Sequence, residues 1–349
     1  MLSSYASNAV LSKARAMYGK RLRAKDYQEL CGCSSVTEVA LYLKNSTNFK
    51  SSLENINEHD VHRGHLEVLI KKKLFSDFAS LGRYELSSGE LLYEYIIKRA
   101  EISQIMTSLM LFTAGRSDEY IYSMPMFFNK HTRINLPALG KIKNYDDFLD
   151  AIKFTTYYKL LKDFKPVNNE PLDLTLIETT LHTDNYKTML KSINAYKNKD
   201  VKTELLNIFN SYIDLSNFIR IMRLKKYYKA DSEYIKKLIL HVGSLSQKQI
   251  TSMIQADSTQ QVIDVIKHTY LSKWVQNIDD NTYIDELPNR VNFYRCRHNI
   301  HFSIKSPVVI LSYIILSEIE LSNIINIIEG VRYGLPKKEI NDMLIYKKN

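Results

Sequence analysis

The chain has 349 residues, of which 45% are hydrophobic and 25% charged, the balance of a globular protein that can bury a large core. Ten glycines and seven prolines are few for this length and argue against β-sandwiches and barrels, and three cysteines argue against a disulfide framework. The net charge of +10 favours an acidic partner, which could be nucleic acid, anionic lipid or an acidic protein face.

The first predicted helix lies within residues 1–20, a segment that lacks the continuous apolar core of a signal peptide. It includes the sequence YASNAVLSK, in which Asn8 sits among small and apolar residues. Residues 27–46 follow and contain the sequence CGC, with Cys31 and Cys33. This segment aligns without a gap on residues 250–269, where Ile254 and Ala256 replace the two cysteines. We therefore interpret CGC as an ordinary helix junction and not as a metal or redox pair.

Three histidines at a spacing of three, His59, His62 and His65, stand in the sequence EHDVHRGHLE at 58–67. On a helix they could share one face and bind zinc, but no fourth ligand with a matching spacing is visible. The favoured interpretation is the polar start of a helix that continues into an apolar run.

An amphipathic stripe with apolar residues at offsets 0, 3, 4 and 7 occurs three times farther along the chain, as expected for one face of a helix. An acidic residue precedes each stripe and an amide lies within it, for which we predict a hydrogen bond between helices or from helix to loop. The three sets are Glu101, Ile102, Gln104, Ile105, Met106 and Leu109; Asp214, Leu215, Asn217, Phe218, Ile219 and Met222; and Glu320, Leu321, Asn323, Ile324, Ile325 and Ile328. Asn8 takes the amide position in a weaker fourth copy.

The segment downstream of each stripe also recurs. Lys44, Lys153 and Lys267 take the same place in three versions of it, and Asp257 or Ser258 is predicted to cap the helix that leads to Lys267. We infer three versions of one helical unit of roughly 110 residues and the start of a fourth, a period too long for the common solenoids.

The predicted division is residues 1–100 for the first repeat, 101–211 for the second, 212–317 for the third and 318–349 for a C-terminal half-repeat. The half-repeat has to cover its apolar stripe, and we expect it to pack back on the first repeat. The predicted fold class is all-α, with three homologous helical bundles.

Three features lie near the C-terminus. The sequence RCRHNIH at 295–301 is interpreted as a solvated helix junction, with contact to a phosphate or an acidic partner as the alternative. The longest apolar run, 307–316, is followed by Glu318 and Glu320, well short of the roughly 20 residues that a membrane span needs, so no spanning segment is expected. Pro336 is predicted in the first turn of a last helix.

Sequence motifs of catalysis are not found. The chain has no GxxxxGK[ST], GxGxxG, HExxH or GxSxG sequence and no EF-hand loop. We therefore predict no catalytic residue, no cofactor-binding residue and no metal ligand, and the favoured class is an adaptor rather than an enzyme.

Two terminal segments resemble a known family. Residues Glu318 to Ile340 carry ExExxNIxxIxxGxxxGLPxxxI, which is similar to the C-terminal signature of the C subunits of V-type and A-type ATPases, whose eukaryotic counterpart is the d subunit. Residues Asn8 to Leu30 are similar to the start of the same family. The resemblance covers essentially the whole chain, whereas the segment 124–139 departs from the pattern expected there.

The resemblance implies a funnel of three helical domains around a pseudo-threefold axis. It implies a non-catalytic member of the central stalk that couples the membrane rotor ring (c or K subunits) to the central shaft (D and F subunits), in an ion-transporting pump or ATP synthase. Such a protein would sit at the cytoplasmic side of the membrane and be attached only through the complex. It would have no cofactor and no nucleic-acid partner.

A basic helical nucleic-acid-binding or scaffold protein is the alternative, suggested by the net charge and by mixed tyrosine and lysine segments such as KKYYK. The basic clusters at 71–73 and 223–229 are interleaved with acidic residues along the chain, which argues for solvated helix faces instead.

Overall fold

The computed structural model describes residues 2–54, 56, 61–82, 89–166, 171–279 and 284–347, and these residues form helices, turns and loops without a strand. The all-α prediction is therefore confirmed for the described part of the chain. The chain divides into two compact units, one formed by Met1–Tyr158 with Cys296–Asn349 and the other by Lys159–Arg295. These units are defined by spatial contacts, and the division into four sequence blocks remains a prediction.

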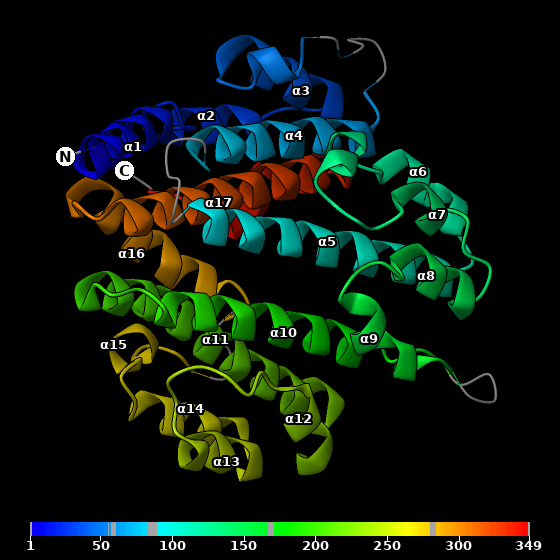
Figure 1. The fold of residues 1–349 in the computed structure, drawn as a ribbon, viewed down its shortest axis with the longest axis vertical. Helices are drawn as coiled ribbons and strands as arrows, with labels where there is room; N and C mark the ends of the chain where they lie inside the picture. The colour runs from blue at the N-terminus through cyan, green and yellow to red at the C-terminus, as the bar shows by residue number, and fades with distance from the viewer. Residues whose placement is uncertain are drawn as a thin grey trace. The chain divides into compact units, whose positions relative to one another are not determined.

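Unit 1 (residues 1–158 and 296–349) contains most of the helices (Figure 1). In chain order they are α1 (Leu2–Gly19), α2 (Ala24–Leu30), α3 (Val36–Ser46), η1 (Lys50–Ser52), α4 (Arg63–Gly82), α5 (Gly89–Thr113), η2 (Ser117–Glu119), α6 (Tyr120–Ser123), η3 (Met126–Lys130), α7 (Leu136–Leu139), α8 (Tyr145–Ile152), α17 (Ser306–Arg332) and α18 (Lys337–Met343).

Unit 2 (residues 159–295) contains the remaining helices. They are η4 (Lys162–Phe164), α10 (Leu174–Asn194), α11 (Lys199–Tyr228), α12 (Ser232–Leu238), α13 (Gln247–Gln255), α14 (Thr259–Lys267) and α15 (Ser272–Val275), while α9 (Tyr157–Leu161) and α16 (Leu287–Phe302) each cross from one unit to the other.

Three helices begin at the same kind of cap. The side chains of Ser35, Asn144 and Ser258 accept hydrogen bonds from backbone amides three residues on, at the starts of α3, α8 and α14. Such a cap satisfies an amide that would otherwise have no partner in the first helical turn. Each cap lies nine residues before one of the three repeated lysines. Of the two cap residues predicted for α14, Ser258 is confirmed.

Helix α17 is the central helix of unit 1. Every residue from 306 to 316 is buried, and α17 packs against α1, α4 and α3; Figure 1 shows α17 running beside α1 and α4. By length and composition α17 is able to cross a membrane, so the prediction that no segment is long and apolar enough to span one is wrong. However, 61% of its most apolar window is buried inside the protein, as expected for a core helix that is apolar all round.

The C-terminal residues share a hydrophobic cluster with residues near the N-terminus. Ile324, Ile327 and Ile328 of α17 and Ile340 of α18 are at most 1% exposed, and they pack in one cluster with residues 22–70. Pro336 lies at the N-cap of α18, one position earlier than predicted. Because these side chains bury apolar surface from two distant parts of the chain, the C-terminus stabilises the N-terminal helices.

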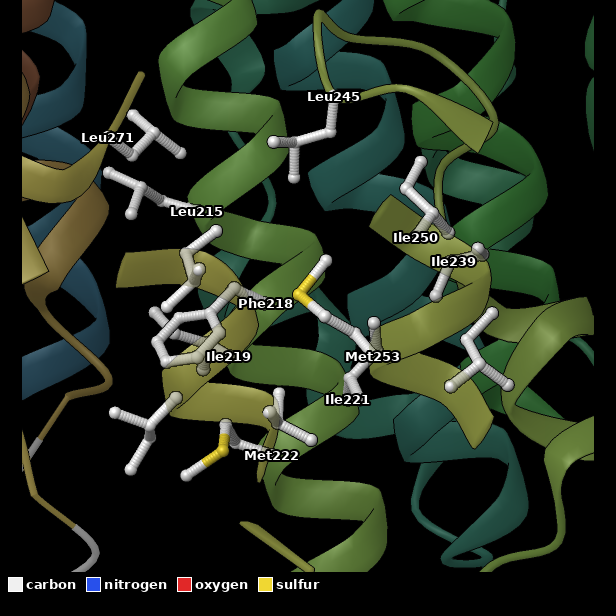
Figure 2. Close-up of a cluster of buried hydrophobic side chains, with 14 of the residues drawn as sticks. Leu215, Phe218, Ile219, Ile221, Met222, Ile239, Leu245, Ile250, Met253 and Leu271 are labelled. Carbon is white, nitrogen blue, oxygen red and sulfur yellow. The ribbon is translucent and has the colours of Figure 1, made fainter. Parts of the chain in front are cut away.

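The core of unit 2 is built around the repeated stripe of α11. Leu215, Phe218, Ile219 and Met222 are all buried, and Figure 2 shows them beside Met253 from α13. In the other two stripes, Met106, Leu321 and Ile325 are only partly buried, so the stripe is fully buried in α11 alone.

Candidate functional site

The predicted acidic residue of the middle stripe, Asp214, anchors a loop in unit 2. Its Oδ2 accepts hydrogen bonds from the backbone amides of Ser244 and Leu245, at 2.9 and 3.1 Å, and from the hydroxyl of Tyr270, at 2.7 Å. Burial raises the pKa of Asp214, and these three donors oppose that shift because they stabilise the charged form. Asp214 thus holds both the loop before α13 and the segment after α14 to α11.

Glu101 has the same role in unit 1. Its carboxylate accepts hydrogen bonds from the hydroxyls of Thr132, at 2.6 Å, and Tyr157, at 2.8 Å. Burial raises the pKa of Glu101, and the two hydroxyls oppose the shift. Tyr157 follows Glu101 by 56 residues, and Tyr270 follows Asp214 by the same number.

The third acidic residue, Glu320, lies beside a small cavity in unit 1. The backbone amide of Leu22 donates to its Oε1 at 3.5 Å. Glu320, Asn48, Asp77 and Tyr313 are among the residues that line this cavity of about 30 Å³, room for one or two water molecules. Burial raises the pKa of Glu320 to about 7, and Lys73 and Arg21 oppose the shift.

The repeated amides form the predicted hydrogen bonds in three of four places. Asn217 bonds to both the amide and the carbonyl of Leu240, each at 2.8 Å, and Asn323 bonds in the same way to Ile345, at 2.9 and 2.8 Å. Gln104 instead accepts from the hydroxyl of Tyr120, at 2.8 Å. Asn8 is exposed, so the prediction fails for the weak fourth copy.

The histidine cluster is not supported as a zinc site. Nδ1 of His62 accepts a hydrogen bond from the amide of Gly64, just inside the start of α4, and His65 lies one helical turn farther on. His59 lies outside the described residues. Among the residues that are described, no group of three metal-ligating side chains is present.

The cysteines are packing residues in the described structure. Cys31 and Cys296 are buried, Cys33 is half-buried, and none of the three is joined in a disulfide. Burial is the largest of several causes that raise the pKa of the Cys33 thiol. A raised pKa disfavours the reactive thiolate. This agrees with the interpretation of CGC as a helix junction.

A wide groove with exposed apolar residues lies in unit 1. Its volume is about 770 Å³, and its lining comes from α3, α4, α5, α6 and the end of α17. Met110 and Tyr122 line it and are 51% and 67% exposed. Its three arginines, Arg63, Arg116 and Arg332, are each paired with a neighbouring glutamate, so the rim is polar rather than basic. A groove of this size with a mixed lining can receive either a segment of a protein or a small ligand.

The basic sequence 295–301 occupies the last turns of α16. His298 and His301 are exposed, and Arg297 is half-buried. The pKa of His301 is lowered by partial burial and then by three arginines, Arg21, Arg297 and Arg15. Cys296 and Ile300 of this segment are buried, and α1 contributes to the cluster, so the choice between a solvated junction and contact with a phosphate or an acidic partner stays a prediction.

Sequence reasoning missed the two tyrosines that bind the buried carboxylates, Tyr157 and Tyr270. Their equal spacing from Glu101 and Asp214 is visible in the sequence and could have identified them. It also missed Arg220 in unit 2, whose Nη1 donates to the hydroxyl of Thr179 at 2.9 Å and to the carbonyl of Leu238. Burial lowers the pKa of Arg220. No signal in the sequence separates Arg220 from the other basic residues of α11.

Together, the described residues define an all-helical protein in which buried acids and amides hold loops to long helices. A solvent-open groove with exposed apolar residues lies in unit 1. The chain belongs to the ATP synthase (C/AC39) subunit family, because the model of that family matches residues 10–343.

Curated relatives agree with this assignment. The chain is 25% identical to the C subunit of the A-type ATP synthase of Methanosarcina mazei over 342 residues, which cover 96% of this chain and 91% of the relative. It is also 25% identical to the C subunit of the A-type ATP synthase of Methanococcoides burtonii, over 96% of this chain and 93% of the relative. It is 21% identical to that of Pyrococcus abyssi, covering 95% and 88%.

Proposed function

We propose that this chain is a non-catalytic member of the central stalk of a V/A-type rotary ATPase and couples the membrane rotor ring to the central shaft. The observation that carries the proposal is the family match over residues 10–343, together with relatives named as C subunits of A-type ATP synthases that align over nearly their whole length. The partners would be the c or K subunits of the ring and the D and F subunits of the shaft. The chain would act at the cytoplasmic side of the membrane in an ion-transporting complex.

The buried polar contacts support a mechanical role. A protein that couples two rotating parts has to transmit torque without deforming, and hydrogen-bonded buried acids and amides restrict loops to one arrangement. Glu101, Asp214, Asn217 and Asn323 each hold a loop or a later segment to a long helix. The equal spacing of the Glu101–Tyr157 and Asp214–Tyr270 contacts supports homologous repeats, and we propose that three repeats surround a pseudo-threefold axis.

We place the contact with the shaft at the groove of unit 1. Met110 and Tyr122 supply exposed apolar surface there, and the ion pairs that Arg63, Arg116 and Arg332 form with glutamates supply a polar rim, the arrangement common in protein interfaces. A stable joint would need an interface of more than about 1,000 Å² in total, so the groove would form only part of it.

Affinity purification of the tagged full-length chain from native membranes tests the function. We expect shaft and ring proteins to be recovered with the wild-type chain, and less of the shaft with Met110→Asp/Tyr122→Asp. Recovery of no ATPase component by the wild-type chain would overturn the proposed function. Normal recovery of the shaft by the folded double variant would overturn the placement at the groove.

A further inference from the structure

The positive charge of this protein is concentrated in two stretches that contain no acidic residue. Residues 1–25 contain six lysines and arginines and no Asp or Glu, and residues 296–317 contain two more and again no Asp or Glu. These two stretches therefore account for +8 of the net charge of +10. Basic clusters elsewhere, such as 71–73, have acidic residues close by in the sequence.

Unit 1 brings the two stretches together. Arg15 of α1 donates from Nε to the carbonyl of Ile300 at 2.8 Å and from Nη2 to the carbonyl of Ser303 at 2.7 Å, so it caps the end of α16. The ring of His301 lies edge-on to Tyr18 at 5.7 Å between centroids, and the guanidinium of Arg21 lies 4.0 Å from the centre of the Tyr18 ring.

Two apolar side chains protrude from this basic cluster. Phe302 is the last residue of α16 and is 72% exposed, and Ile304 in the connection to α17 is 81% exposed. The side chain of His298 packs against Phe302, with 4.9 Å between ring centroids. Single exposed apolar side chains are common on protein surfaces, but here an aromatic and a β-branched aliphatic residue lie two positions apart beside a basic cluster.

We propose that this tip, formed by Arg15, Arg21, Arg297, His301, Phe302 and Ile304, is a docking site for a membrane surface that contains anionic lipids. Lipid phosphates would face the cations, and Phe302 and Ile304 would enter the boundary between headgroups and acyl chains. A nucleic acid would match the cations and could stack on Phe302, but it would offer no apolar surface to Ile304. The site requires no other protein and is independent of the proposed function.

Vesicle flotation with the purified full-length chain tests the proposal. Vesicles of phosphatidylcholine alone are compared with vesicles that contain about one third phosphatidylglycerol, at physiological salt. We expect binding to the anionic vesicles only. Arg297→Glu lowers the net charge of the tip by two. Because each charge is worth roughly a fivefold change in affinity, this variant should bind the anionic vesicles about thirtyfold more weakly. Phe302→Ser/Ile304→Ser should weaken binding several-fold while the dependence on salt stays the same.

Matched control variants lie in unit 2. Lys236→Glu makes the same charge change at an exposed helical position, and Tyr227→Ser/Tyr228→Ser removes two side chains that are 69% and 71% exposed. Both controls should bind like the wild-type chain, and thermal melts should show that all variants are folded.

Three results would overturn the proposal. The first is a wild-type chain that floats with neither kind of vesicle or with both kinds equally. The second is a loss of binding in the controls as large as in the tip variants. The third is an RNA oligonucleotide that the chain binds through Arg297 while Phe302→Ser/Ile304→Ser has no effect on vesicle binding. Recovery of ATPase components by affinity purification would be unaffected by the first or third result, so the two proposals can fail separately.

Discussion

The hydroxyl of Tyr270 donates a hydrogen bond of 2.7 Å to the buried carboxylate of Asp214, 56 residues earlier in the chain. In unit 1, Tyr157 makes the equivalent contact of 2.8 Å with Glu101, also 56 residues earlier. A tyrosine and a carboxylate thus join a later segment of the chain to a long helix in both places. The contribution of this contact to the free energy of unfolding can be measured directly.

Tyr270→Phe should destabilise the protein by about 1–3 kcal/mol, because it removes a donor from a buried, charged acceptor. Chemical denaturation of the single variants and of the double variant with Asp214→Asn gives the coupling energy between the two side chains. Tyr157→Phe should behave similarly in unit 1. Additive effects of the two substitutions at Asp214 and Tyr270 would mean that the hydrogen bond contributes nothing to stability.

Asn217→Leu should lower the stability by about 1–3 kcal/mol for each backbone group of Leu240 that it leaves without its partner. Asn323→Leu should have a similar effect through Ile345. Asn8→Leu is the matched control, since Asn8 is exposed, and it should change the stability by less than about 0.5 kcal/mol. Thermal melts of the three variants separate these outcomes, and equal melting temperatures would contradict the structural role.

Gly243→Ala should destabilise unit 2 strongly. Gly243 has a φ of +119°, which side chains rarely tolerate, and a Cβ there would lie 2.2 Å from Oδ1 of Asp214. We expect a loss of at least about 2 kcal/mol, combining backbone strain with displacement of the buried carboxylate. Gly19→Ala is the control because nothing lies within 4 Å of its added methyl group. A variant at Gly243 as stable as this control would be inconsistent with this conformation of the loop.

Glu320→Gln should stabilise the protein at pH 8 and leave it nearly unchanged at pH 5. The pKa of Glu320 is about 7 in the folded protein and 4.5 in an unstructured peptide, so the folded state binds more protons between these values. Stability contributed by this group therefore falls as pH rises through that range. We expect the gain at pH 8 to be about 1–3 kcal/mol. Melting temperatures measured at both pH values test the sign, and a gain at pH 5 alone would contradict it.

Removal of residues 318–349 should prevent stable folding of unit 1. The deletion exposes the cluster that contains Leu30, Leu43 and Leu66, each now 0% exposed. Burial of a large apolar side chain is worth about 1.5–3 kcal/mol, and several would lose their cover. Gel filtration and calorimetry of the truncated chain provide the check. A monomeric truncated chain with a cooperative melt would show that the C-terminus is dispensable for folding.

Much of the local structure could be predicted from the sequence. The apolar stripes identified the faces of α5, α11 and α17, and the amides Asn217 and Asn323 were expected to bond from helix to loop. These predictions succeeded because helix periodicity and the cost of an unpaired buried amide act on any chain, whatever its fold. The family resemblance, carried by residues 8–30 and 318–340, was confirmed because both segments have sequence patterns specific enough to identify.

Only the tertiary structure decided which of the similar residues are buried together. Asn8 and Asn323 occupy corresponding places in the sequence, yet Asn8 is exposed and Asn323 is bonded at both ends of its amide. The basic residues of α1 and of α16 lie almost 300 positions apart, and packing alone placed Arg15 at the end of α16. Local patterns determine the conformation of a helix and its apolar face. Which helices then pack together depends on long-range contacts that no short segment of sequence encodes by itself.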